Sequence, residues 1–207
     1  IYEKEAKLVL WNDVELGMAQ MNENWNRPLN SRVKMDVWTN AEEVELFLNG
    51  RSLGTKANLL DDPGQRNKTT WQVDYEPGVL KAVARTKGKF VAEHVVETVG
   101  EAVALKLEAD NPDWTSDGFD LQHIRISAVD NQARTVFDAK ELVKFSVKGP
   151  ARLIGVDNGD MMTDELHVAK ERSLHRGTAL AILRAGREPG RVTFTAAAGG
   201  FEPVALT

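Results

Sequence analysis

The sequence predicts an all-β protein made of two tandem β-sandwich domains. Apolar residues recur at every second position over many short segments, which is the spacing of half-buried strands. Turn sequences rich in Gly, Asn, Asp and Pro separate these segments at short, regular intervals. No long segment of helical period alternates with the strands, as a parallel nucleotide-binding sheet would require.

The length and one change of pattern predict where the two domains meet. The chain has 207 residues, and soluble domains most often contain about 100 to 150 residues, so two modules are expected. A fresh alternating segment begins immediately after Gly100-Glu101. We therefore assign residues 1–100 to the first domain, with 1–30 as a lead-in of short strand and loop, and 101–207 to the second.

The first domain contains two predicted hairpins. Alternating apolar residues at 44–48 run into Asn49-Gly50, two residues that tolerate the positive φ of a tight turn. A similar pattern lies on either side of the turn at 76–78, and the polar segment 59–67 reads as a surface loop. About six or seven short strands are predicted, among them residues 33–37, 44–48, 69–75, 79–84 and 90–99, and this number and spacing are typical of an immunoglobulin-like sandwich.

The second domain repeats this organisation. Alternation begins at residues 103–109 and returns after turns at 116–118 and 130–133. Short helices within 138–143 and 161–170 are the competing interpretation, but neither segment has the length of a convincing helix. Strands are predicted at 103–109, 124–128, 143–147, 152–156, 178–184 and 191–196, which gives a second immunoglobulin-like sandwich.

The composition excludes several classes of function. The net charge is −5, and acidic and basic residues are spread evenly, so no basic stripe for nucleic acid is present. The absence of cysteine excludes disulfides and thiolate metal sites. The four histidines are scattered without metal-ligand spacing, and no apolar run approaches the ~18 residues of a membrane span. We expect no cofactor.

Two sets of motifs resemble one enzyme family. Residues 37–54, which read Val-Trp-Thr-Asn-Ala-Glu-Glu followed by the first hairpin, are similar to the β-sandwich after the catalytic barrel in bacterial β-galactosidases of glycoside hydrolase family 2. The Gly-Val-Asp-Asn-Gly-Asp sequence at 155–160 and the Gly-Thr-Ala-Leu-Ala-Ile sequence at 177–182 resemble the last domain of the same enzymes. The lead-in departs from the family, with Asn24-Trp25-Asn26-Arg27 where a His-Trp-Asn-Trp segment is often found.

The resemblance implies that this chain is the non-catalytic C-terminal portion of a β-galactosidase-type enzyme. The family's barrel, the expected partner in the same polypeptide, supplies an acid/base glutamate and a nucleophilic glutamate, and no segment here matches either motif. The expected role is domain packing and shaping of the substrate cleft. A (β/α)₈ barrel also takes about 250 residues of strand–helix alternation. We therefore expect the fragment itself to be inactive.

Two tryptophans are candidate carbohydrate contacts. Trp114 lies in a polar loop sequence, and an exposed aromatic ring suits the apolar face of a sugar. Trp38 follows Val37 in an alternating strand and is either core or exposed. Trp71 shares a face with Val73 and is interpreted as core. An anchoring role between domains is the alternative for Trp114.

Residues 157–160 form an oxygen-rich loop. Asp157 and Asp160 are weak candidate ligands for a hard cation such as Ca²⁺. A turn in which Asn158-Gly159 reverses the chain and the aspartates accept backbone hydrogen bonds explains the same sequence without a metal.

Two other functions stay open for the whole chain. One is a stand-alone carbohydrate-binding module, and the other is an immunoglobulin-like spacer of a bacterial surface protein. The sequence leaves the compartment open, and a periplasmic or secreted location in a bacterium is expected.

Overall fold

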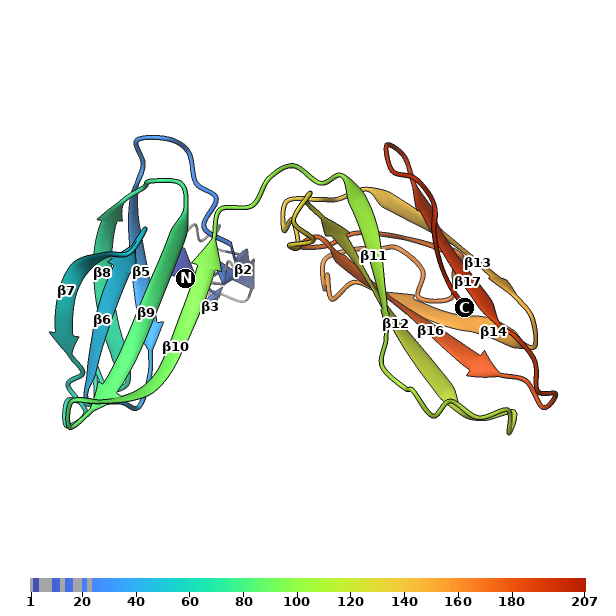
Figure 1. Ribbon diagram of the computed structural model, residues 1–207, viewed down its shortest axis with the longest axis horizontal. Helices are drawn as coiled ribbons and strands as arrows, with labels where there is room; N and C mark the ends of the chain where they lie inside the picture. The colour runs from blue at the N-terminus through green and yellow to red at the C-terminus, as the bar shows by residue number, and fades with distance from the viewer. Residues whose placement is uncertain (1, 4–8, 12–13, 17–19, 22–23) are drawn as a thin grey trace. The chain divides into compact units, whose positions relative to one another are not determined.

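The structure, a computed structural model, describes residues 2–3, 9–11, 14–16, 20–21 and 24–207. The predicted strand and loop of the lead-in therefore fall partly outside the described residues. All described elements are strands, and no described helix is long and apolar enough to cross a membrane. The chain divides into two compact units, Ile1–Thr98 and Val99–Thr207 (Figure 1).

The first unit is a two-layer sandwich. One sheet has the strand order β10-β9-β6-β7, and the other consists of β5 and β8. Short antiparallel pairs β1–β4 and β2–β3 lie in the lead-in. The strands are β1 (Tyr2–Glu3), β2 (Val9–Trp11), β3 (Val14–Leu16), β4 (Gln20–Met21), β5 (Arg32–Trp38), β6 (Glu43–Leu48), β7 (Arg51–Ala57), β8 (Lys68–Asp74), β9 (Val79–Thr86) and β10 (Lys89–Glu97).

Alternation along the strands places the first core between these two sheets. On β6, Val44, Leu46 and Leu48 are buried, and the hairpin predicted after them is confirmed by the pairing Leu48↔Arg51. The turn residues Asn49 and Gly50 have positive φ, at 52° and 79°. The buried core residues of this unit are Trp25, Val33, Met35, Leu46, Leu48, Trp71, Val73, Tyr75, Leu80 and Val96.

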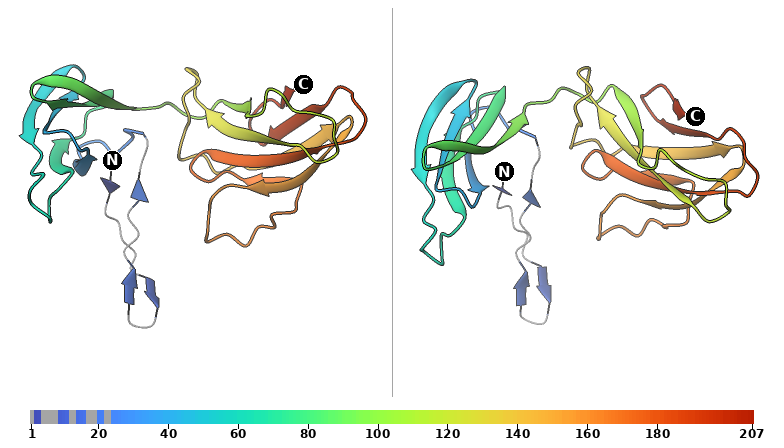
Figure 2. Two further views of the ribbon diagram at one scale, coloured as in Figure 1. Left: turned by 90° about the horizontal axis from the view of Figure 1, so that it is seen from below. Right: turned by 60° about the horizontal axis from the view of Figure 1, so that its bottom comes forward.

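The second unit consists of two four-stranded antiparallel sheets, with the orders β11-β12-β16-β14 and β15-β13-β17-β18 (Figure 2). The fold class predicted from alternation is therefore confirmed. The strands are β11 (Ala104–Ala109), β12 (Leu121–Val129), β13 (Leu142–Lys148), β14 (Ala151–Asp157), β15 (Glu171–Ser173), β16 (Thr178–Ala185), β17 (Thr193–Ala198) and β18 (Val204–Leu206).

The core of the second unit joins both sheets through aliphatic and aromatic side chains. Phe145 on β13 and Phe194 on β17 stack with their ring centroids 5.6 Å apart. Ile126 on β12 and Leu183 on β16 face them from the other sheet and are fully or almost fully buried. Short helices were the alternative for 138–143 and 161–170, but residues 138–141 and 161–170 are loops and residues 142–143 begin β13. The second of these, between β14 and β15, extends away from the sheets (Figure 2).

Candidate functional site

Trp114 is held in a rigid corner between β11 and β12. Its indole Nε1 donates a hydrogen bond to the carbonyl oxygen of Asp120 at 3.1 Å, and its ring packs partly buried against the second core. The Asp120 carboxylate accepts hydrogen bonds from the backbone N and the Oγ1 of Thr115. The bond from the Thr115 amide is the main reason that the pKa of Asp120 lies below its ordinary value. Trp114 is thus an anchor of this corner as well as a surface group.

A cavity of about 610 Å³ opens beside Trp114. Ile124, Leu183 and Phe194 form its apolar base, and Asn111 and Arg191 contribute polar groups. The side-chain amide of Gln122 forms hydrogen bonds with backbone groups of the adjoining loop through both its nitrogen and its oxygen. The cavity is large enough for a ligand of one or two rings.

Trp38 lies at the end of β5 and is 62% exposed. Of the two alternatives, core or exposed, the structure therefore supports the exposed position. Trp38 points to the outer face of the β5–β8 sheet, opposite the buried side chains of Val33 and Met35. The ammonium group of Lys68 lies 5.8 Å from the centroid of its ring. Trp71, on β8, is buried in the first core, as its alternation with Val73 indicates.

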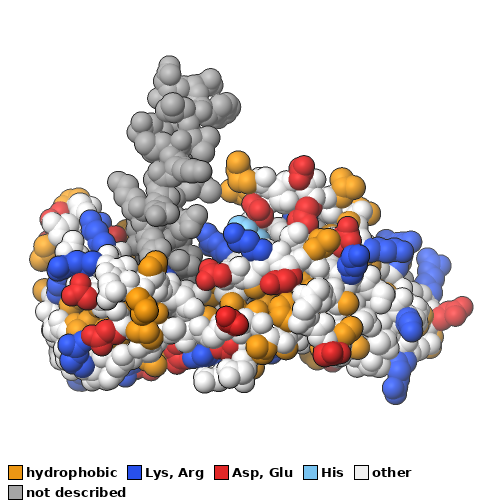
Figure 3. Space-filling model, turned by 90° about the horizontal axis from the view of Figure 1, so that it is seen from above, with side chains coloured by type: hydrophobic (Ala, Val, Ile, Leu, Met, Phe, Trp, Pro, Cys, Tyr) orange, Lys and Arg blue, Asp and Glu red, His pale blue; other side chains and the backbone are white. Residues whose placement is uncertain are grey.

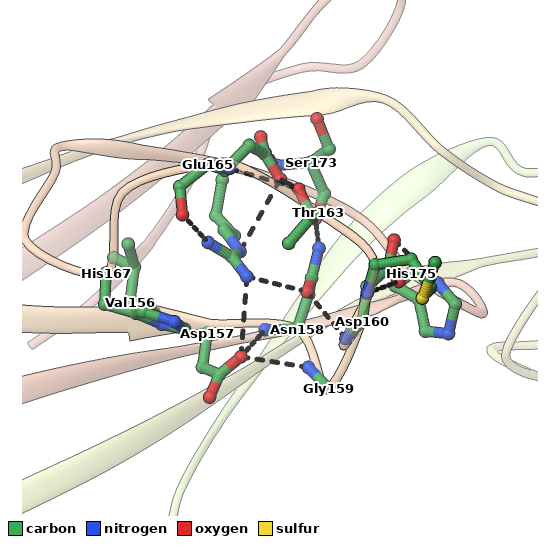
Figure 4. Close-up of polar contacts among 12 residues, drawn as sticks. Val156, Asp157, Asn158, Gly159, Asp160, Thr163, Glu165, His167, Ser173 and His175 are labelled. Atoms are coloured by element: carbon green, nitrogen blue, oxygen red, sulfur yellow. Dashed lines mark hydrogen bonds and ion pairs between the residues drawn. The ribbon is translucent and has the colours of Figure 1, made fainter. Parts of the chain in front are cut away.

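The Asp157–Asp160 loop has the geometry of side-chain-capped turns. Asp157 Oδ1 accepts hydrogen bonds from the amides of Asn158, at 2.6 Å, and Gly159, at 3.0 Å (Figure 4). Asp160 Oδ1 accepts from the amide of Met162. The amides of Gly159 and Asn158 lower the pKa of Asp157 because they stabilise its charged form. Within residues 24–207 and the described parts of the lead-in, no group of three or more acidic or histidine side chains has the arrangement of a metal site.

A buried guanidinium, which the sequence pattern does not indicate, organises this loop. Arg172, on β15, has no exposed surface. Its Nη1 donates to the carbonyl oxygen of Glu165 at 2.9 Å, and its Nη2 donates to Asn158 Oδ1 at 3.0 Å. Its Nη2 also lies 3.5 Å from Asp157 Oδ1. The sequence carries no clear signal for it, because β15 is only three residues long and shows no period that would mark Arg172 as inward-facing.

Glu165, in the middle of the loop between β14 and β15, completes the network. Its Oε1 accepts a hydrogen bond from the amide of Ser173 at 2.9 Å, and its Oε2 lies 3.6 Å from Arg172 Nε. Partial burial raises the pKa of Glu165, but the hydrogen bonds from Ser173 and the charge of Arg172 outweigh it, so the pKa is lowered. Asn158 Nδ2 donates to the carbonyl oxygen of Ser173, which links the two ends of the loop directly (Figure 4).

The loop held by this network presents apolar side chains to solvent. Its four large hydrophobic residues are between 74% and 83% exposed, which is unusual for a segment so firmly attached. They are Met161, Met162, Leu166 and Val168.

In each of the adjacent acidic pairs Glu42-Glu43 and Asp61-Asp62, one carboxylate accepts a hydrogen bond from a backbone amide. Glu42 Oε2 accepts a hydrogen bond from the amide of Lys87, and Asp62 Oδ1 accepts one from the amide of Gly64. Both carboxylates therefore stabilise turns. On the face shown in Figure 3, acidic and basic side chains are interspersed.

Comparison with known proteins assigns the two halves of the chain separately. Residues 105–207 match the glycoside hydrolase family 2 C-terminal domain 5, and residues 30–92 match a domain of unknown function, DUF4982. The chain is 32% identical over 197 residues to the β-galactosidase BoGH2A of Bacteroides ovatus, covering 95% of this chain and 22% of that protein. It is 30% identical over 191 residues to a β-glucuronidase of Formosa agariphila, covering 89% of this chain and 18% of that protein.

Solved structures agree with these matches. A glycosyl hydrolase family 2 member from Bacteroides cellulosilyticus superposes with a TM-score of 0.83 at 35% identity, over 89% of this chain and 25% of that one. The all-β fold and the matched domain together define a C-terminal β-sandwich region. Residues 105–207 match a C-terminal domain of glycoside hydrolase family 2, as the motifs at 155–160 and 177–182 suggested, and the chain as a whole is similar to the C-terminal region of members of that family. It spans about a fifth of the length of the curated relatives named above.

Proposed function

We propose that this chain is the non-catalytic C-terminal portion of a glycosidase whose catalytic barrel lies elsewhere in the same polypeptide. One observation carries the proposal: 95% of the chain aligns with a β-galactosidase of which it makes up only 22%. The barrel of such an enzyme holds its two catalytic carboxyl groups about 5 Å apart when the enzyme retains the anomeric configuration. The all-strand architecture of the described residues supports an accessory role.

We propose terminal β-galactosides as the substrates of the parent enzyme. The relative from Bacteroides ovatus supports this class, and the β-glucuronidase from Formosa agariphila makes glucuronides the competing class. The sugar is selected in the barrel, so the accessory sandwiches are compatible with either class.

The test compares the parent polypeptide with this chain alone on chromogenic β-galactoside and β-glucuronide. We expect the parent to hydrolyse the galactoside and the isolated chain to hydrolyse neither. Hydrolysis by the isolated chain would contradict the accessory role, and a parent active only on the glucuronide would contradict the substrate class.

The loop at 158–170 supports a role in domain packing. Methionine, leucine and valine side chains exposed on a rigid loop are typical of a protein-protein contact, because they gain most when water is excluded from them. We propose that this loop packs against another part of the parent polypeptide and helps to shape its cleft.

The double substitution Met161→Asp and Val168→Asp tests this packing role. It should leave the stability of the isolated chain within about 0.5 kcal/mol, because both side chains are already in water. In the parent polypeptide it should increase proteolytic cleavage between the domains. Phe119→Asp, at an exposed position outside the loop, is the matched control. Unchanged cleavage in the double variant would contradict the packing role.

A further inference from the structure

The outer face of the β5–β8 sheet carries an ordered strip of side chains that ends in Trp38. Directly opposed residues of an antiparallel pair share a face, and four such cross-strand pairs lie along this strip. The pairs are Trp38↔Lys68, Asp36↔Thr70, Lys34↔Gln72 and Arg32↔Asp74. Hydrogen-bonding groups therefore follow the exposed indole in a line along the sheet.

The strands that carry this strip are held in place by side chains on the opposite, inner face of the sheet. Val33 and Met35 alternate with the strip residues and are buried in the first core. Next to the Trp38↔Lys68 pair, the amide of Thr39 donates to the carbonyl oxygen of Asn67 at 2.9 Å, which holds this end of the two strands together. The indole is thus mounted on rigid backbone, and little conformational entropy is lost when a ligand covers it.

The polar groups next to the indole are already positioned. The Asp36 side chain is only 13% exposed, and its Oδ1 accepts a hydrogen bond from Thr70 Oγ1 at 2.6 Å. Its Oδ2 lies 4.0 Å from Lys68 Nζ. The Asp36 carboxylate and the Lys68 ammonium group retain further capacity to accept and donate hydrogen bonds.

The chemistry of the strip favours a sugar over a protein partner. A pyranose presents an apolar face of C–H groups, which stacks on an indole, and a rim of hydroxyls that both donate and accept hydrogen bonds. A protein interface needs a larger apolar centre, and here the neighbours of the single exposed indole are charged or polar. The indole therefore matches the apolar face of a sugar ring, and the polar side chains beside it match its rim of hydroxyls.

We propose that the outer face of the β5–β8 sheet is a carbohydrate-binding site. A pyranose ring of an oligosaccharide or polysaccharide stacks on Trp38, and its hydroxyls bond with Lys68 and Asp36. This site uses no group of the catalytic barrel, so the proposal can be tested independently of the proposed parent activity.

The test is affinity electrophoresis of this chain through gels containing a β-galactan, a β-glucan or a glucuronate-containing polysaccharide, followed by calorimetry on oligosaccharides of any that retard it. We expect retardation by at least one of these polysaccharides. Trp38→Ala should lower the association constant at least tenfold, and Trp38→Phe should keep part of it. Because Trp38 is exposed, both variants should keep the wild-type unfolding midpoint, which is measured in parallel.

Two control variants define the site. Phe90→Ala removes an aromatic ring that is equally exposed, at 64%, on the other sheet, and should bind as the wild type does. Trp114→Ala should also retain binding. The proposal would be overturned if none of the three polysaccharides retarded the chain. It would also be overturned if Trp38→Ala bound as the wild type does, or if Trp114→Ala lost binding while Trp38→Ala kept it.

Discussion

The guanidinium of Arg172 and the side-chain amide of Asn158 meet at 3.0 Å across 14 residues of chain, and the arginine has no exposed surface. This contact, with the bond from Arg172 to the Glu165 carbonyl oxygen, joins both arms of the loop that follows β14. The loop therefore owes its shape to a buried cation rather than to regular secondary structure.

Removal of this cation should destabilise the second unit. In Arg172→Met, the hydrogen bonds to Asn158 and Glu165 are lost and two carboxylates lose their countercharge, so we expect the free energy of unfolding to fall by about 3 kcal/mol. Urea unfolding followed by circular dichroism measures the change. Lys170→Ala, an exposed neighbour on the same segment, is the control and should change it by less than about 0.5 kcal/mol. Equal stability of the two variants would show that the network is not structural.

Acid should weaken the second unit through Asp130. The guanidinium of Arg134 and the amides of Gly100, Arg134 and Gln132 donate to the buried Asp130 carboxylate, and together they hold its pKa far below the ordinary value. The pKa is lower in the folded state than in the unfolded one. This stabilisation is therefore complete above the unfolded pKa, about 4, and is lost as the pH falls through the folded value.

Thermal unfolding between pH 5 and pH 2 measures this dependence. Asp130→Asn should be less stable than the wild type at pH 5 and should lose less stability on acidification. Asp61→Asn, at an exposed loop position, should follow the wild-type curve. Parallel curves for Asp130→Asn and the wild type would rule out Asp130 as the source of the acid sensitivity.

Trp25 should be one of the most sensitive positions of the first unit. It is fully buried, its Nε1 donates to the Glu76 carbonyl oxygen at 2.8 Å, and its ring lies 5.4 Å from that of Tyr75. Trp25→Ala leaves a large cavity and an unpaired carbonyl, so we expect a loss of about 3 to 5 kcal/mol. Trp38→Ala makes the same chemical change at an exposed site and should cost less than about 0.5 kcal/mol in the same denaturant titration. Similar losses at the two positions would contradict the burial of Trp25.

We propose that the two domains fold independently and that their boundary lies at the residues around Gly100. Calorimetry of residues 1–100 and 101–207, expressed separately, should show a cooperative transition for each. The amide of Gly100 donates to Asp130 Oδ2 at 3.0 Å, so residues 99–207 should be more stable than residues 101–207 by about 1 kcal/mol. A single half that unfolds without a cooperative transition would contradict the division.

Alternation and turn chemistry were sufficient to predict most strands. The hairpin at Asn49-Gly50 could be predicted because both the burial of Leu46 and Leu48 and the turn geometry depend on neighbouring residues. The short strands β15 and β18 were not predicted, since three-residue strands have too few positions to show a period. Trp25 was assigned to a lead-in, although it belongs to the first core.

The candidate site residues show the limit of local pattern. The sequence indicates both Trp114, which has polar neighbours, and Trp38 as candidate carbohydrate contacts. The structure places the Trp114 ring against the second core and the Trp38 ring in solvent, and only contacts with distant residues make that difference.

The all-β class and the family motifs could be read from the sequence alone, and the same patterns predict two modules, because alternation, turn residues and short motifs are written within a few neighbouring positions. Tertiary structure decided that Arg172 is enclosed, that Asp157 and Asp160 serve turns and that Trp38 faces outward. Each of these depends on which distant strands come together, and burial and charge pairing are set only when they do.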